Sequence, residues 1–112
     1  MSVYSPELGI ASIRKELGRR LRLQRVVRDL RQQDLADRTG IGVATIRRIE
    51  DGRSDLRFDI LVRLLREFDL LDGLERLVPD PTDSPLVDAD ELPERVRPAG
   101  RPATDWQWND ES

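Results

Sequence analysis

The side chains best suited to recognise another molecule are concentrated between residues 32 and 54 of this 112-residue chain. Arg47 is the strongest of them, because its planar guanidinium can donate two hydrogen bonds to O6 and N7 of a guanine, worth about 1–3 kcal/mol of discrimination. Gln32 lies where a helix would begin, so its amide and the unpaired N–H groups there can bind a phosphate, or it is simply a polar residue of the first turn. The residues that we expect to contact DNA are Gln32, Gln33, Gly42, Val43, Ala44, Thr45, Arg47, Arg48, Arg53 and Ser54.

Two short helices joined by a turn are expected to present these side chains. The first extends from Gln32 to Thr39, and Gly40 supplies the left-handed conformation of a helix C-cap. The second extends from Val43 to Asp51, with Gly42 at its N-cap position. Apolar residues recur at helical spacing on both sides of the two glycines, namely Leu35, Ala36, Ile41, Ile46 and Ile49. This pattern predicts a helix-turn-helix whose second helix enters the major groove of DNA.

The second helix of this pair has an inward and an outward face. Ile46 and Ile49 face inward, which leaves Val43, Ala44 and Arg47 outward. The two small apolar side chains could pack against thymine methyl groups.

Thr45 and Arg48 each have two interpretations, and Glu50 has one. Thr45 can donate to a phosphate or to a base. Arg48 either bonds to the preceding helix or contacts a phosphate. Glu50 could pair with an arginine of a helix earlier in the chain. Arg53 and Ser54, just beyond the helix, are candidates for contacts with the DNA backbone.

Further amphipathic segments flank the pair. Residues 1–10 are expected to form a loose arm or a helix start near Ser5 or Pro6. From about Ala11 to Asp29, apolar residues recur at one-turn intervals: Ile10 just before, then Ile13, Leu17, Leu21 and Val27. Arg14, Lys15, Arg19, Arg20, Arg22, Arg25 and Arg28 fill the other faces, either as a solvated surface or, for some of them, near phosphates.

Two more helices are predicted after residue 56. One begins at Arg57 or Phe58 and ends at Phe68, and a shorter one extends from Gly73 to Val78. The second carries more apolar surface than a short terminal helix can bury against one side. We therefore expect part of this surface to form a two-fold dimer interface, made by Leu70, Leu71, Leu74, Leu77 and Val78.

The charge is distributed unevenly along the chain. The net charge of the whole sequence is −3, but residues 8–48 carry 11 basic and 4 acidic residues, whereas residues 79–112 carry 3 basic and 9 acidic residues. A basic domain followed by an acidic tail is usual for a nucleic-acid-binding protein whose tail has a different partner. The sequence thus predicts a domain at residues 11–78 and an extended, largely irregular tail at residues 79–112.

The tail is rich in proline and acidic residues and poor in apolar ones, so it cannot bury enough surface to fold alone. Leu86, Val87 and Leu92 could add a short strand or contact a partner subunit. Trp106 and Trp108 lie at alternate positions, which puts both rings on one side of an extended segment. They either bind another protein, as tryptophans often do at interfaces, or fold back onto the domain.

Composition excludes several kinds of chemistry. The chain has no cysteine and no histidine, which excludes disulfides, thiol nucleophiles, imidazole bases and the usual zinc clusters. No paired nucleophile and base or phosphate loop occurs, so we expect no catalytic residues, metal site or cofactor. We also expect a cytoplasmic location, since no signal peptide or membrane span is evident.

Residues 30–41 and 45–52 closely resemble the Xre/Cro-type helix-turn-helix regulators. The residues that fit the family pattern are Gln32, Leu35, Ala36, Gly40, Thr45, Ile46, Glu50 and Gly52. The resemblance covers about residues 14–78 and implies a five-helix, lambda-repressor-like domain that binds double-stranded operator DNA as a homodimer. The chain has Gly42 where the family often has serine and Val43 where it has a polar residue, so base readout is expected to depend on Arg47.

A narrower resemblance concerns residues 70–79, residues 84–86 and the Trp-x-Trp sequence before the acidic terminus. Together they look like HipB-type antitoxins, which are encoded beside HipA-like serine/threonine kinase toxins. This implies a repressor of its own operon that also binds the toxin, with Trp106 and Trp108 as the toxin-binding residues. The alternatives are a helix-turn-helix regulator unrelated to a toxin, or an interaction adaptor that does not use DNA.

Overall fold

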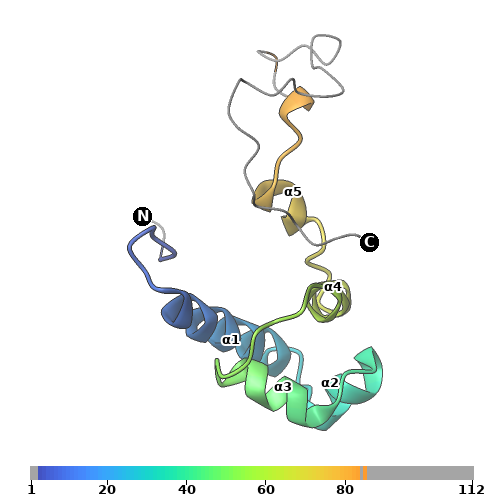
Figure 1. Ribbon diagram of the computed structural model, residues 1–112. Coiled ribbons are helices and arrows are strands. Elements are labelled where there is room, and N and C mark those ends of the chain that lie inside the picture. The colour runs from blue at the N-terminus through green and yellow to red at the C-terminus, as the bar shows by residue number, and fades with distance from the viewer. Residues whose placement is uncertain (1–2, 84, 86–112) are drawn as a thin grey trace, which may run out of the picture. The chain divides into compact units, whose positions relative to one another are not determined.

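The computed structural model describes residues 3–83 and 85, and it is all-helical over this part of the chain (Figure 1). The chain divides into two units, Met1–Leu77 and Val78–Ser112. The first contains α1 (Ile10–Val26), α2 (Gln32–Thr39), α3 (Val43–Glu50), α4 (Phe58–Glu67) and α5 (Gly73–Leu77). The described part of the second contains a 3-10 helix, η1 (Pro81–Asp83). The expected all-α class with five helices is confirmed. Of the predicted tail, residues 79–83 and 85 are described, whereas the rest, including the strand proposed at Leu86, Val87 and Leu92, lies outside the described residues.

The long first helix, α1, buries the middle of its predicted apolar face, where Leu21 is buried and Leu17 packs against the core, but not the two ends of that face. Gly18, Leu21 and Arg25 are its buried residues, while Ile10 and Val27 are 75% and 72% exposed. The reason is length: α1 has 17 residues and α3, which packs on it, has 8, so at about 1.5 Å per residue both ends of α1 extend past the contact. Ile10 and Val27, at the two ends of the predicted apolar stripe, are therefore not part of the core.

The end of α1 also differs from the prediction. The helix ends at Val26 rather than Asp29, because Asp29 adopts a left-handed conformation with φ of 58°. The N–H of Leu30 then bonds to the carbonyl of Arg25 at 3.2 Å, as in the Schellman motif that ends many helices. Asp69 ends α4 in the same way, with φ of 60°. Aspartate adopts the left-handed conformation more readily than most residues with a side chain. Both helices can therefore end at an aspartate, without the glycine that usually occupies this position.

The hydrophobic core lies between α1, α2, α3 and α4. Phe68, Leu35 and Ile46 are the largest fully buried side chains, one each from the α4 C-cap, α2 and α3. Helix α3 packs against both α1 and α2, and α2 also packs against α4. The core cluster consists of Leu21, Leu35, Ala36, Ile41, Ile46, Ile49, Leu64 and Phe68. The buried faces of α2 and α3 therefore pack against this core, and their exposed residues lie on the opposite faces.

None of the described helices is both long enough and apolar enough to cross a bilayer.

Candidate nucleic-acid interface

The turn between α2 and α3 has the geometry that its two glycines predict. Gly40 has φ of 76° and its N–H bonds to the carbonyl of Ala36 at 2.9 Å, which ends α2. Gly42 is extended and forms the N-cap of α3. Thr39 fastens the turn, because its hydroxyl donates to the carbonyl of Leu35 at 2.7 Å and accepts from the N–H of Ile41 at 3.2 Å. The predicted bounds of α2 are confirmed, and those of α3 to within one residue.

Helix α3 presents a narrower outward face than expected. Ile46 and Ile49 are 2% and 4% exposed, as predicted. Ala44 and Arg47 are exposed on the opposite side. Val43 is only partly exposed and packs against the core, so its assignment to the outward face was wrong. The reason is helical geometry: Val43 lies three residues before Ile46 and so shares its face.

The two arginines of α3 are both exposed but differ in their contacts. Arg48 donates from Nη2 to the hydroxyl of Thr45 at 3.3 Å, within the same helix. Of its two expected interpretations, a bond to α2 is therefore not formed, and a phosphate contact stays a prediction. Within residues 3–83, Arg47 has no hydrogen bond and no acidic partner, so its guanidinium is available to a ligand.

The side chains at the start of α2 form hydrogen bonds within the protein that the sequence did not indicate. Gln32 donates from Nε2 to Oε1 of Glu50 at 3.0 Å, and Gln33 donates to Asp37 at 2.9 Å. Asp34 accepts the backbone N–H of Arg31 at 2.8 Å, as the acidic half of a capping box. Hydrogen bonds from the side chain and backbone of Arg31 lower the pKa of Asp34 to about 2, so it is ionised at neutral pH.

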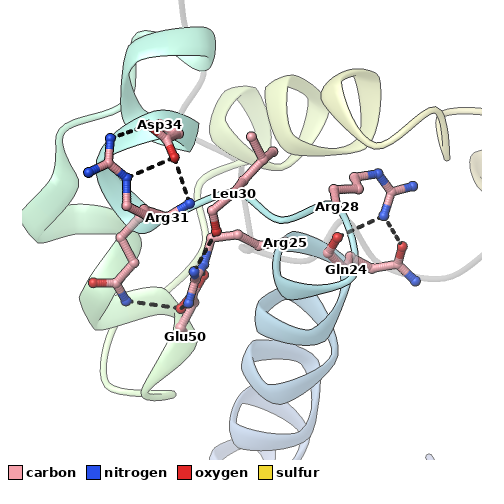
Figure 2. A network of polar contacts seen from close by, with 8 residues as sticks. Gln24, Arg25, Arg28, Leu30, Arg31, Asp34 and Glu50 are labelled. Carbon is pink, nitrogen blue, oxygen red and sulfur yellow. Dashed lines mark hydrogen bonds and ion pairs between the residues drawn. The ribbon is translucent and has the colours of Figure 1, made fainter.

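A buried ion pair fixes α3 against α1 (Figure 2). Arg25 donates from Nε to Oε2 of Glu50 at 2.7 Å and from Nη2 to Oε1 at 3.0 Å, while its Nη1 bonds to the carbonyl of Leu30 at 2.8 Å. Arg25 and Glu50 are 9% and 8% exposed. The hydrogen bonds to Glu50 raise the pKa of Arg25 against the opposing effect of burial. The expected pairing of Glu50 with an arginine of the first helix is confirmed.

The assignment of Arg25 and Arg28 to an outer, solvated or phosphate-binding face was wrong for Arg25 and incomplete for Arg28. Arg28 donates to the carbonyl and side chain of Gln24 at 2.8 and 2.7 Å and to the carbonyl of Phe68 at 2.8 Å. Its guanidinium also lies 4.9 Å from the centre of the Phe68 ring. It therefore connects the end of α1 to the end of α4. A helical wheel places Arg25 near the buried face, four residues after Leu21, but does not show that it is the arginine that pairs with Glu50.

Several other basic residues have acidic partners. Arg19 and Arg20 both pair with Glu16, at 3.0 and 2.7 Å, and their hydrogen bonds lower its pKa to about 2. Arg14 pairs with Asp55 at 2.8 Å. The positive charge available from α1 is thus smaller than its arginine count.

The loop after α3 keeps its two candidate residues at the surface. Arg53 pairs with Asp51 at 3.0 Å, with its side chain 63% exposed. Ser54 donates to the carbonyl of Asp55 at 3.0 Å. Both side chains lie on the C-terminal side of the recognition helix. The Arg53–Asp51 pair is exposed and therefore weak, so Arg53 can exchange Asp51 for a phosphate.

The remaining predicted contacts lie at or beyond the end of the first unit. Leu70 packs against the core, and Leu71 and Leu74 are partly exposed. Leu77 and Val78 are 68% and 76% exposed. Trp106 and Trp108 lie outside the described residues.

Comparison with known proteins agrees with this geometry. A family model described as a helix-turn-helix domain matches residues 16–77, more than half of the chain. The chain therefore belongs to this helix-turn-helix family, and the fold and the family together identify it as a DNA-binding regulator. No curated protein shows detectable sequence similarity to it.

Proposed function

We propose that this chain is a sequence-specific transcriptional repressor that binds operator DNA as a homodimer. The observation that supports this most is the state of Arg47, which is exposed on α3 with no acidic partner within residues 3–83, while Ile46 and Ile49 of the same helix are buried. A free guanidinium on the outward face of a recognition helix is suited to a guanine edge in the major groove.

Replacing Arg47 with alanine tests this assignment. The Arg47→Ala protein is expected to lose about 1–3 kcal/mol of discrimination between operator and mismatched duplexes, because the bidentate contact is lost. Competition fluorescence anisotropy measures both affinities. The matched control is Arg22→Ala, which removes another exposed arginine without an acidic partner in the described part of the chain but on α1, and it should leave base preference unchanged.

Two outcomes of that experiment would contradict the proposal. Unchanged affinity and preference in Arg47→Ala would mean that the recognition face is wrong. Weak binding of the wild-type protein to all duplexes, abolished by moderate salt, would favour an interaction adaptor that does not use DNA.

The homodimer is supported by the apolar surface near the end of the first unit. Leu77 and Val78 are largely exposed, and an apolar hollow of about 470 Å³ adjoins α5, with Leu61, Leu65, Leu70, Leu74 and Leu77 among its lining residues. A second copy could cover these leucines, and a two-fold dimer would place two recognition helices about 34–36 Å apart, matching successive major-groove turns.

The repressor is further proposed to be the antitoxin of a HipA-like serine/threonine kinase toxin, to regulate its own operon, and to have no enzymatic activity. This rests on the resemblance of residues 70–79 and 84–86 and of the Trp-x-Trp sequence to HipB-type antitoxins. Trp106 and Trp108 are the proposed toxin-binding residues. The alternative is a helix-turn-helix regulator that has no toxin partner.

Deleting residues 105–112 separates the two roles. The shortened protein is expected to bind operator DNA as a dimer with wild-type affinity, while its affinity for the kinase encoded by the neighbouring gene falls at least tenfold, because aromatic anchors dominate such interfaces. Calorimetry measures the toxin affinity and anisotropy the operator affinity. Unchanged toxin affinity would disprove the tail assignment and leave the DNA assignment intact.

A further inference from the structure

A basic hollow lies where α2 and α4 end. It has a volume of about 250 Å³ and is lined by Arg38, Thr39, Arg63, Arg66 and Glu67. Arg38 pairs with Glu67, with Nη1 3.1 Å from Oε2. Arg63 and Arg66 are exposed and have no acidic partner in the part of the chain that the structure describes. We call this set of five residues the arginine hollow.

The net positive charge of the arginine hollow exceeds the charge that would balance the two helix C-termini beside it. A helix C-terminus carries about half a negative charge, and arginines near it are often explained by that alone. Two helices end at the arginine hollow, so together they account for about one positive charge. The lining residues carry three guanidinium groups and the carboxylate of Glu67, which leaves two positive charges. The carboxylate of Asp34 also interacts with Arg38, but it already pairs with Arg31 at 2.9 Å. About one charge therefore remains for an external anion.

Operator phosphates are poorly placed to supply that anion. In the proposed complex, α2 directs its first residue, Gln32, toward the DNA, and the arginine hollow lies at the other end of the helix beside Thr39. The two ends are about 10 Å apart at 1.5 Å per residue. This step rests on the proposed DNA face. The hydroxyl of Thr39 is already bonded to Leu35 and Ile41, so a ligand would meet the guanidinium groups of Arg63 and Arg66.

We propose that the arginine hollow binds an acid-rich segment of a protein partner, through carboxylates that contact Arg63 and Arg66. Guanidinium groups bind carboxylates with two parallel hydrogen bonds. The hollow is smaller than the roughly 300–1,000 Å³ of typical small-molecule sites. It therefore suits one or two side chains inserted from a larger partner better than a whole metabolite.

The test uses the full chain and a fluorescein-labelled hexaglutamate peptide as probe. In low salt, the double variant Arg63→Glu/Arg66→Glu is expected to bind the peptide about tenfold or more weakly than wild type, because two attractive contacts become repulsive. The control Arg22→Glu, a single reversal on α1, is expected to change the affinity by less than about twofold. Operator affinity should be unchanged in the double variant. Should its melting temperature fall, Arg63→Gln/Arg66→Gln replaces it.

Four results would overturn the inference. The first is no peptide binding by wild type, and the second is an equal loss in Arg22→Glu, which would mean unspecific attraction. The third is displacement of the peptide by pyrophosphate at lower concentration than by unlabelled hexaglutamate, which would indicate a phosphate site. The fourth is loss of operator affinity in the double variant, which would make these arginines DNA contacts. That last result leaves the proposed repressor function standing, whereas failure of Arg47→Ala to alter base preference leaves the arginine hollow untouched.

Discussion

The contact between α1 and α3 and the outward face of α3 use the same residue type for opposite purposes. Arg25 is buried and donates three hydrogen bonds, two to Glu50 and one to Leu30. Arg47 is exposed, with no partner among residues 3–83. The difference teaches that a count of arginines in a basic domain overstates the charge available to DNA, because some of that charge holds the recognition helix in place. Three substitutions test this division between positioning and recognition.

The largest effect is expected for Glu50→Ala. It leaves the guanidinium of Arg25 buried without its carboxylate and frees the amide of Gln32. We expect a loss of about 3–5 kcal/mol in the free energy of unfolding, measured by urea denaturation. The control Arg25→Met/Glu50→Leu removes both charges and should be nearly neutral. A loss below about 1 kcal/mol in Glu50→Ala would show that this pair does not position α3.

A smaller effect is expected for Gly18→Ala. A Cβ atom at Gly18 would lie 2.9 Å from the carbonyl oxygen of Glu50 and closer still to that of Ile49. Backbone atoms cannot rotate away, so α1 and α3 must separate, at a cost of about 1–3 kcal/mol in unfolding free energy. Gly73→Ala is the matched control, since nothing lies within 4 Å of its added Cβ. A gain in stability of Gly18→Ala, from the better helix propensity of alanine, would contradict the close approach of α1 and α3 at this position.

The smallest effect concerns the exposed pair Arg31–Asp34, at 2.9 Å. The folded-state pKa of Asp34 is about 2, below its ordinary value of 3.8. Its contribution to stability is therefore present above about pH 4 and is lost progressively as the pH falls toward 2. The difference in melting temperature between wild type and Asp34→Asn should shrink over that interval. A carboxyl titration midpoint near 4 by NMR would contradict the pairing.

The local features of the fold were predictable because they depend on neighbouring residues. Gly40, Gly42 and the spacing of Ile46 and Ile49 are enough to place α2, the turn and α3. The end of α1 was missed, because its left-handed stop is Asp29 rather than a glycine, whereas the end of α4 before Asp69 was predicted to within one residue.

The candidate site divides in the same way. The exposure of Ala44 and Arg47 followed from the helical period alone, whereas the sequence left the surroundings of Arg48 open. Val43 was assigned to the wrong face, although its spacing of three residues from Ile46 already places it toward the core. The bond from Gln32 to Glu50 joins residues 18 positions apart, and no local pattern signals it.

By itself, the sequence determined that this protein is a bundle of short helices with a helix-turn-helix at residues 32–50, since periodicity, caps and turn glycines act over a few residues. Only the tertiary structure decided which arginines are available to a ligand. Arg25 and Arg47 have similar propensities and identical charges, and what separates them is whether a carboxylate from a distant segment lies within hydrogen-bonding distance. That distance depends on the packing of α1 against α3, which no single segment encodes.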